Sequence, residues 1–525
     1  MASVNSLASQ VQAMSEQVNN ISASLLAAQF AIKSQRQQIQ ELIAAQASNS
    51  VIITSLQATS SHGDNAWILA STALVVMMTI PGLALFYGGL AQAPNVLSTV
   101  MQSFSIMCTV SFLWFSFGYS LCFTAGDVFY GNSSNFWLHD MTSKKMRNDS
   151  EKLFMVYQMT FAVISAAIIC GSFAERMRFS AMLIFIAIWH ILVYCPVAHW
   201  SWGPGGFLNT AGCLDYAGGD VVHVSAGFSG LVASMLVGKR RGISQGQEIS
   251  PHNALLVFLG ASLLWVGWFG FNAGSAFAAD HMAINAMATT QMSGACGGLA
   301  WMAVEWIMRK RPTVVGIVSG SICGLVCITP GCGYVDLAGA VAIGLIGGIT
   351  GFFSIQMKHM FGFDDALDAF GVHGICGVVG CLATGLFADQ GVTRDPNENG
   401  AFYGKPSQLY IQLYGVVVVV AYCSVISFLI LKLLDIVMIA VTGTGIRCSP
   451  EAEKIGLDIS EHGDSLIKET PVFSLGQIKV GNQHVLQAGW NENTSVVPVS
   501  TSITRVQVSD PVHLEDKVHP FQQDE

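Results

Sequence analysis

The chain has 525 residues, of which 52% are hydrophobic and only 11% are charged. Soluble domains carry about 25% charged residues, so this composition excludes an ordinary soluble protein and indicates a polytopic membrane protein. The formal net charge of −9 lies largely in the segment after Thr442 and offers no basic surface to a nucleic-acid partner.

The N-terminal segment, residues 1–46, has the heptad spacing of a coiled coil, because its apolar residues alternate between steps of four and three. The repeated positions, of which Gln35 is a polar interruption, are Leu7, Val11, Met14, Val18, Ile21, Leu25, Ala28, Ile32, Gln35, Ile39 and Leu42. We predict a self-associating extracellular stalk, with a single amphipathic helix that lies on the membrane or on the protein itself as the alternative. Residues 47–64, rich in Ser, Ala and Thr, are predicted to form a linker.

Eleven apolar segments follow between residues 65 and 442. Their lengths are close to or above about 18 residues, which is the length at which a helix crosses a hydrocarbon layer. They run over residues 67–90, 97–123, 153–173, 179–198, 221–237, 254–277, 286–308, 314–328, 334–355, 370–387 and 410–441. The predicted fold is therefore an all-α polytopic membrane domain with eleven transmembrane helices.

Lys and Arg gather in alternate loops between these segments, a distribution typical of cytoplasmic loops. The basic residues are Arg176, Arg178, Lys239, Arg240, Arg241, Arg309, Lys310, Arg311 and Lys358. With an odd number of crossings, the N-terminus is then outside and the C-terminus in the cytoplasm. Asn132 and Asn148 occupy Asn-X-Ser motifs in a loop predicted to be external. They are predicted glycosylation sites, although such short motifs also arise by chance.

Two histidines occur in the same short motif in distant apolar segments. His223 lies in VVHVSAG and His373 in GVHGICG, and both motifs read Val-His, three residues, then Gly. They fall in the fifth and tenth predicted spans, as expected for two inverted five-helix repeats with a site at their interface. A single membrane histidine more often serves as a hydrogen-bonding group between helices, but an equivalent pair indicates a functional site.

Longer motifs resemble those of the ammonium transporter family, which includes the Amt and Mep transporters and, more distantly, the Rh proteins. These motifs are FAERMRFSAMLIF, DYAGGDVVHVSAG, SPHNALLVFLGASLLWVGWFGFNAGSA, GLVCITPGCGYV and DAFGVHGICGVVGCLATGLFA. The resemblance covers about residues 64–465. It implies a homotrimer of eleven-helix subunits in a lipid bilayer, each subunit with its own path for ammonium or ammonia. We expect a plasma-membrane transporter, not an enzyme, without cofactor or metal.

The resemblance also implies which residues form the path. Trp202 and Ser275 match the outer recruitment site for ammonium, and Asp215 matches the carboxylate beside it. WGPGG is one residue longer here than in the bacterial form, which leaves Trp200 as the alternative to Trp202. For Asp215 the alternative role is to cap the helix that holds His223.

Phe161 and Phe271 match two stacked aromatic residues that close the outer mouth, with plain core packing as the alternative role. The twin histidines then line a narrow, mostly apolar lumen. An ion entering such a lumen meets a large desolvation penalty, which ammonium avoids by losing a proton. The imidazoles of His223 and His373 can alternate as donors and acceptors and relay that proton. Potassium has no proton to lose, so this chemistry predicts selectivity for ammonium.

Two further predicted sites lie towards the cytoplasm. Asp368, five residues before His373, is predicted to cap that helix, with proton exit as the alternative. The motif GLDISEHGD, in residues 443–469, resembles the family's regulatory segment, in which each subunit's tail rests on its neighbour. Ser460 stands where plant members carry a phosphorylatable threonine, so added charge there would detach the tail; a plain solvated serine is the alternative. Residues 470–525 are predicted to be disordered.

Two other classes of function compete with transport. A sensor would bind ammonium at the same site and signal through its tail or stalk, but such a protein has no need of both histidines or of an open lumen. An enzyme is disfavoured, because Cys376 and Cys381 lie in a packed helix with no base or cofactor motif nearby.

Overall fold

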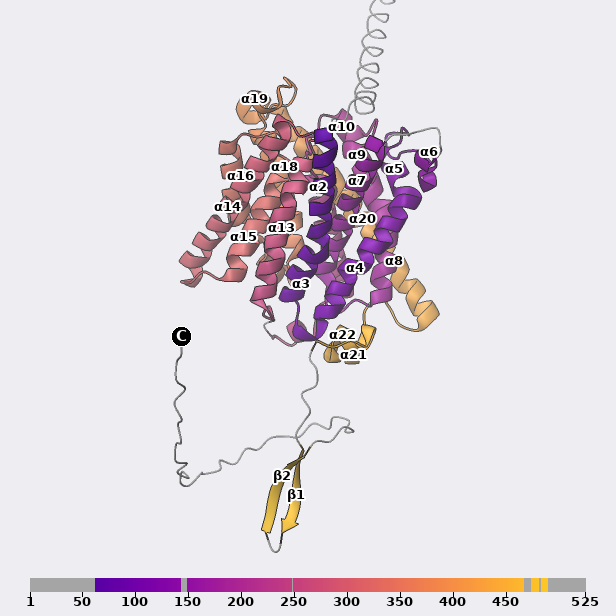
Figure 1. Ribbon diagram of the computed structural model, residues 1–525, viewed down its shortest axis with the longest axis vertical. Coiled ribbons are helices and arrows are strands. Elements are labelled where there is room, and N and C mark those ends of the chain that lie inside the picture. The colour runs from indigo at the N-terminus through magenta and orange to yellow at the C-terminus, as the bar shows by residue number, and fades with distance from the viewer. Residues whose placement is uncertain (1–61, 143–148, 248, 467–473, 481–482, 490–525) are drawn as a thin grey trace, which may run out of the picture. The chain divides into compact units, whose positions relative to one another are not determined.

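The computed structural model describes residues 62–142, 149–247, 249–466, 474–480 and 483–489 (Figure 1). The predicted stalk, most of the linker and Asn148 lie outside the described residues. The chain divides into two compact units, residues 1–466 and residues 467–525. The first unit contains the whole predicted membrane domain and residues 443–466 of the predicted regulatory segment.

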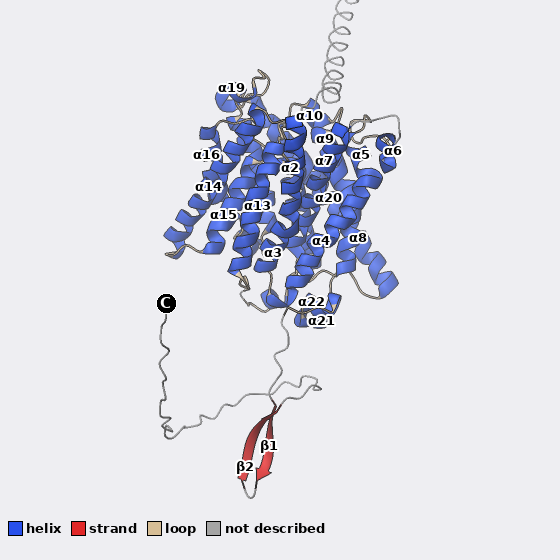
Figure 2. Ribbon diagram, in the orientation of Figure 1, coloured by secondary structure: helices blue, strands red, loops and turns tan. Residues whose placement is uncertain are grey.

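The first unit is a bundle of long, roughly parallel and antiparallel helices (Figures 1 and 2). Its first half comprises α2 (His62–Met77), α3 (Ala84–Leu90), α4 (Val96–Leu113), α5 (Tyr119–Phe123), α6 (His139–Thr142), α7 (Asp149–Phe173), α8 (Phe179–Trp189), α9 (Cys195–Trp202), α10 (Phe207–Thr210) and α11 (Ser225–Val237). Its second half comprises α12 (Arg241–Ser244), α13 (Ala254–Gly274), α14 (His281–Arg309), α15 (Val314–Ile328), α16 (Leu337–Ser354), α17 (Met357–Phe361), α18 (Cys376–Phe387), α19 (Gln390–Thr393) and α20 (Ser407–Thr442).

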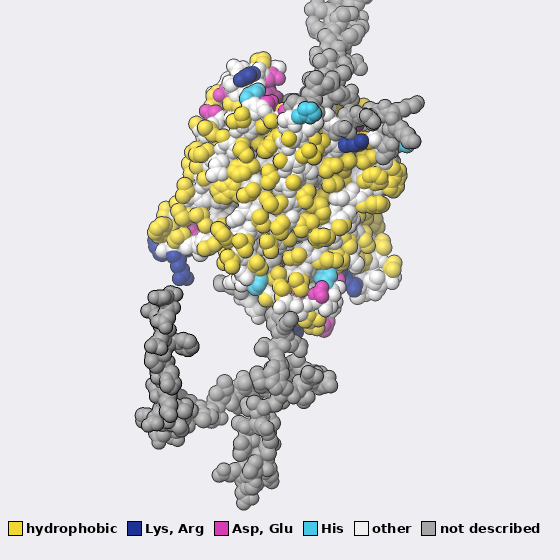
Figure 3. All heavy atoms as spheres, in the orientation of Figure 1, with side chains coloured by type: hydrophobic (Ala, Val, Ile, Leu, Met, Phe, Trp, Pro, Cys, Tyr) yellow, Lys and Arg dark blue, Asp and Glu magenta, His cyan; other side chains and the backbone are white. Residues whose placement is uncertain are grey.

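Among the described residues, nine helical spans are long and apolar enough to cross a membrane. This result confirms a polytopic all-helical membrane domain but does not reach the predicted count of eleven. The two remaining predicted segments correspond to α14 and α15. Helix α15 has only 15 residues, and α14 has 29 residues but includes polar side chains such as Thr289, Thr290 and Gln291. Exposed hydrophobic side chains cover the visible face of the bundle, with charged residues towards its ends (Figure 3).

Side-chain caps mark the start of four consecutive helices of the second half. Asn253, Asp280, Thr313 and Asp336 each accept hydrogen bonds from backbone N–H groups in the first turn of α13, α14, α15 and α16, respectively. Residues of these types are favoured N-caps because their oxygens satisfy amides that have no partner within the helix. Helix α14 therefore starts five residues before the predicted start at residue 286, at the position that Asp280 caps.

The second unit contains a short antiparallel hairpin of β1 (Ser474–Val480) and β2 (Gln483–Gly489), with Val480 opposite Gln483 (Figure 2). This pairing differs from the prediction that residues 470–525 have no regular structure. Gly and Asn stand between the strands in the sequence, and such pairs favour two-residue hairpin turns. The turn signal in the sequence could therefore have indicated the hairpin.

Candidate functional site

His223 and His373 lie side by side in the centre of the helical bundle. Each belongs to a π-helical segment that leads into a longer helix, residues 219–224 before α11 and residues 370–375 before α18. The two Nδ1 atoms are 3.2 Å apart, and the ring centroids are 5.3 Å apart at an interplanar angle of 26°. Since a hydrogen bond needs one donor and one acceptor, one Nδ1 carries a proton and the other does not. Both side chains are buried, with 1% and 5% of their surface exposed.

The glycine of each Val-His-x-x-x-Gly motif explains how the two segments come so close. A methyl group on Gly227 would overlap the backbone of Gly374, next to His373. A methyl group on Gly377 would lie 3.0 Å from the Cβ of His223. Each motif thus packs its glycine against the histidine segment of the other motif. Such reciprocal packing is what a pseudo-twofold axis between inverted repeats predicts.

An aspartate eight residues before each histidine holds the start of its helical segment. The carboxylate of Asp215 accepts four backbone hydrogen bonds, from the N–H groups of Gly218, Gly219, Asp220 and Val221. The Oδ2 of Asp365 accepts hydrogen bonds from the N–H groups of Phe370, at 2.8 Å, and Gly371, at 3.4 Å. The geometry of Asp215 corresponds to the capping role and not to a free cation-binding carboxylate.

Asp365 takes the role that was predicted for Asp368. The side chain of Asp368 instead pairs with Lys358, whose Nζ lies 2.6 Å from its Oδ1. The backbone of Asp368 is left-handed, with φ of 62°, so this residue lies in the turn that precedes the helix. The prediction of a cap at Asp368 is therefore wrong. Equal spacing from the two histidines, eight residues in each case, is the sequence signal that points to Asp365.

The cap at Asp365 predicts a pH-dependent stability. Burial and the neighbouring Asp368 carboxylate raise the pKa of Asp365 to about 6. A raised pKa means that the folded state binds the proton more tightly, so this stabilisation is complete below about pH 4 and is lost as the pH rises through 6. We expect the wild type to lose roughly 2 kcal/mol of unfolding free energy between about pH 4 and 6 from this group.

The variant Asp365→Asn keeps an acceptor oxygen but cannot ionise, so this loss should disappear in thermal unfolding of detergent-solubilised protein. Asp464→Asn is the control, since Asp464 is exposed. An unchanged pH profile in Asp365→Asn would contradict the assignment.

Aromatic side chains pack on one side of the histidines. Phe161 and Phe271 stack with centroids 4.3 Å apart, and the ring of Phe271 lies 6.0 Å from that of His223. Trp202 contacts Phe161 edge-on at 5.9 Å, and its Nε1 donates to the carbonyl oxygen of Asp215. Trp200 is instead buried, and its Nε1 donates to a loop carbonyl. Of the two tryptophans, Trp202 is the one beside the stacked phenylalanines.

Ser275 lies on the same side, at the C-terminal end of α13. Its Oγ donates a hydrogen bond to the carbonyl oxygen of Phe271 and lies 3.4 Å from the hydroxyl of Tyr157. Tyr157 is fully buried, and its ring packs against Phe161 at 5.1 Å. No motif in the sequence singles out Tyr157. It connects the predicted recruitment serine to the aromatic pair.

A small void of about 10 Å³ lies against Phe271 and both histidines. A cavity needs about 10–15 Å³ to hold one water molecule, so this space holds no hydrated ion. Its lining is Met78, Leu83, Phe86, Ile164, Ile168, His223, Leu264, Trp268, Phe271, Ile322 and His373. The two imidazoles and the indole of Trp268 are the polar side chains of this lining. The Nε1 of Trp268 donates to Thr329, which leaves the histidines as the groups able to bind a passing molecule.

A family model described as Ammonium Transporter Family matches residues 66–466. The chain belongs to the ammonium transporter family. An ammonium transporter from Bacillus subtilis is 44% identical over 412 residues, which is 78% of this chain and 99% of that protein. Ammonium transporter 1 from Dictyostelium discoideum is 38% identical over 410 residues, 77% of this chain and 86% of that protein.

Solved structures of the ammonium transporter family show the same fold. Mep2 from Candida albicans superimposes with a TM-score of 0.69 at 34% identity, covering 75% of this chain and 88% of that chain. A structure described as a sensor Amt protein superimposes with a TM-score of 0.69 at 29% identity, covering 76% of this chain and 98% of that chain. The relatives are transporters and not enzymes, in agreement with the prediction from sequence.

The segment that resembles the family's regulatory tail packs against its own bundle. It forms α21 (Pro450–Ile455) and α22 (Leu457–His462), which lie at one end of the helices (Figure 1). The N–H of Ser98, in the first turn of α4, donates to Asp458, and the N–H of Leu457 donates to Asn95. Ser460 is exposed on α22, and its Oγ donates to the carbonyl oxygen of Gly456.

The candidate glycosylation site Asn132 lies on an exposed loop between α5 and α6. Its Oδ1 accepts a hydrogen bond from the N–H of Ser134, within its own motif. The side chain therefore lies at the surface of the bundle.

Proposed function

We propose that the chain is a plasma-membrane ammonium transporter that works as a homotrimer with a separate path in each subunit. The observation that carries this proposal is the small, mostly apolar void lined by Phe271 and the histidine pair, which has no room for a hydrated cation. Ammonium would be recruited outside the aromatic pair, release a proton there and cross the void as ammonia. The proton would pass to external water when conduction is neutral, and along the His223–His373 contact when charge crosses with ammonia. The N-terminus would lie outside and the C-terminus in the cytoplasm.

Recruitment would take place beside Trp202 and Ser275. The indole face offers a cation–π contact worth roughly 0.5–2 kcal/mol, depending on desolvation. The Oγ of Ser275 already donates its proton to a carbonyl, so its lone pairs remain as acceptors for an ammonium N–H. The role of Asp215 would be to position the segment of His223, because four backbone N–H groups already occupy its oxygens.

Deprotonation would follow from the apolar lining beyond Phe161 and Phe271. A charged ion in such a space loses its hydration without compensation, whereas neutral ammonia needs one or two hydrogen-bonding partners. The Nε2 of His223 is buried and has no hydrogen-bond partner within the described residues. It is therefore available to ammonia, while the Nδ1 contact keeps the two rings in a fixed orientation.

A current measurement tests this proposal. Wild-type protein in a heterologous cell should give a saturable response to ammonium and methylammonium and no response to potassium. An ammonium current would mean that charge crosses together with ammonia, and a change of internal pH without current would mean neutral conduction. A potassium current of similar size would refute the deprotonation mechanism. Absence of both ammonium signals, in protein shown to reach the surface, would favour the sensor alternative.

We also propose that Ser460 is a regulatory phosphorylation site. A phosphate on its exposed hydroxyl would add about −1.5 to −2 charge on α22. That helix also carries Asp458 and Glu461, whose carboxylates accept the N–H groups of Ser98 and Phe179. Repulsion between the phosphate and these carboxylates would weaken the contacts that hold the tail to the bundle.

A further inference from the structure

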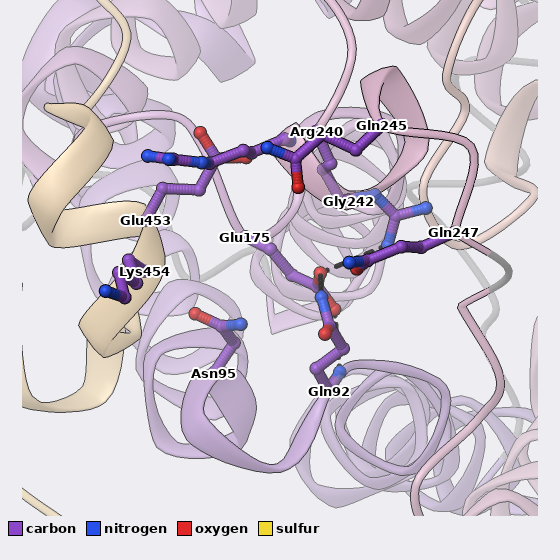
Figure 4. Close-up of a pocket in the computed structure, with 10 residues that line it drawn as sticks. Gln92, Asn95, Glu175, Arg240, Gly242, Gln245, Gln247, Glu453 and Lys454 are labelled. Carbon is purple, nitrogen blue, oxygen red and sulfur yellow. Dashed lines mark hydrogen bonds and ion pairs between the residues drawn. The ribbon is translucent and has the colours of Figure 1, made fainter. Parts of the chain in front are cut away.

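A polar pocket lies between the tail helix α21 and the bundle, away from the ammonium path. It has a volume of about 320 Å³ and is open on one side. Glu453 and Lys454 of α21 form one wall, and residues 240–247 of the loop before α13 form another (Figure 4). Gln92, Asn95 and Glu175 complete the lining. The volume falls in the range of about 300–1,000 Å³ that small-molecule sites occupy.

The acidic groups of this pocket are already neutralised. Glu175 accepts hydrogen bonds from Gln92 and pairs with the guanidinium of Arg240 at 3.1 Å (Figure 4). Glu453 accepts the backbone N–H of Arg241 and pairs with Arg447 at 2.7 Å. These two carboxylates therefore do not present a free negative charge to a ligand.

Two cationic side chains of the lining remain uncompensated. The guanidinium of Arg241 and the ammonium group of Lys454 make no hydrogen bond or ion pair with the described residues. The side-chain amides of Gln245 and Gln247 likewise have no hydrogen-bond partner in this part of the chain. The pocket thus offers two positive charges and two amide donors, and this set suits a dianion with several acceptor oxygens.

We propose that this pocket binds the phosphate group of a small phosphorylated polyol. A phosphate monoester carries about −1.5 to −2 charge at pH 7 and three acceptor oxygens, which matches the two cations and the amide donors. A phosphate alone would fill only part of the volume. The carboxylates of Glu175 and Glu453 and the amide of Asn95 suit the hydroxyl groups of the attached polyol, because each can accept a further hydrogen bond.

Binding would tie the tail to the bundle. Lys454 belongs to α21, whereas Arg241 begins α12 in the loop between α11 and α13. A phosphate held by both side chains would add a bridge between these segments, beside the existing contact of Glu453 with the N–H of Arg241. The proposal concerns a site separate from the pore and holds whichever species crosses the membrane.

Direct binding to the purified full-length protein tests the proposal, with glucose 6-phosphate as the soluble probe. Vesicles of phosphatidylcholine with and without phosphatidylinositol 4-phosphate present the same chemistry as a lipid headgroup. We expect binding to the wild type and a loss of affinity of at least about tenfold in the double variant Arg241→Gln, Lys454→Gln. The double variant Lys310→Gln, Arg311→Gln removes the same charge elsewhere and should bind as the wild type does.

Hydrogen exchange provides a readout of the bridge. The probe should slow exchange of residues 450–462 in the wild type and not in the Arg241→Gln, Lys454→Gln variant. Binding of the soluble probe alone would identify a free metabolite, and binding of the vesicles alone would identify a headgroup; both support the site. Equal affinity of the two double variants would overturn it, as would equal binding of unphosphorylated glucose or no binding of either probe at millimolar concentration.

Discussion

Replacing both pore histidines, in the variant His223→Ala, His373→Ala, is expected to lower the ammonium transport rate by roughly 100-fold. The void between them and Phe271 has an otherwise apolar lining, apart from an indole N–H that is already bonded. Without the imidazoles, ammonia would cross this space with no hydrogen-bond partner. An unsatisfied buried polar group costs about 1–3 kcal/mol, and each 1.4 kcal/mol is about a factor of ten in rate.

The two single variants separate the roles of the rings. His373→Ala leaves the Nε2 of His223 in place but removes the partner of its Nδ1, so transport should fall less than in the double variant. His190→Ala is the matched control, because His190 is equally buried but does not line the void. Uptake and current should be measured on surface-quantified protein. Wild-type rates in the double variant would show that ammonia needs no hydrogen-bonding relay in the lumen.

Much of the membrane domain was predictable because its signals are local and strong. Apolar runs of helical length located the spans, and the repeated Val-His-x-x-x-Gly motif located the two histidines. The Nδ1 atoms of these histidines are 3.2 Å apart in the structure. The motif also included Gly227 and Gly377, whose lack of a side chain permits that approach. Length and hydropathy alone did not settle the count of crossings, since α14 mixes polar residues into a long helix and α15 is short.

The features that have no local signal in the sequence depend on contacts between distant segments. Asp365 and Asp368 are the same residue type three positions apart, and only the turn geometry decides which one reaches the N–H groups of residues 370 and 371. Tyr157 lies near Ser275 because its hydroxyl reaches the C-terminal end of α13, where it donates to the carbonyl oxygens of Gly270 and Phe271, a contact that no local motif encodes. The pocket beneath α21 likewise exists only because the tail folds back onto the bundle.

Replacing Arg240 by Gln is expected to destabilise the folded protein by about 3–5 kcal/mol. Arg240 is buried and pairs with two buried carboxylates, Glu175 at 3.1 Å and Asp364 at 2.9 Å. Removing the guanidinium would take the charge of Arg240 away from both buried carboxylates and leave Glu175 without an ion-pair partner. The matched control is Arg309→Gln. Arg309 also pairs with a glutamate, but its side chain is 52% exposed, so its loss should cost less than about 1 kcal/mol.

The same network predicts a characteristic response to acid. Burial alone would raise the pKa of Asp364, but hydrogen bonds from Arg240 and the charges of Arg176 and Arg240 outweigh it and lower the pKa to about 2. A lowered pKa means that this stabilisation, roughly 2.5 kcal/mol, is complete above about pH 4 and is lost as the pH falls through 2. Wild-type protein in detergent should therefore lose thermal stability between about pH 4 and 2, and Arg240→Gln should lose much less there, because Asp364 would no longer have a strongly lowered pKa. Equal acid sensitivity in the two proteins, or a cost in Arg240→Gln no larger than in Arg309→Gln, would show that water already screens these charges.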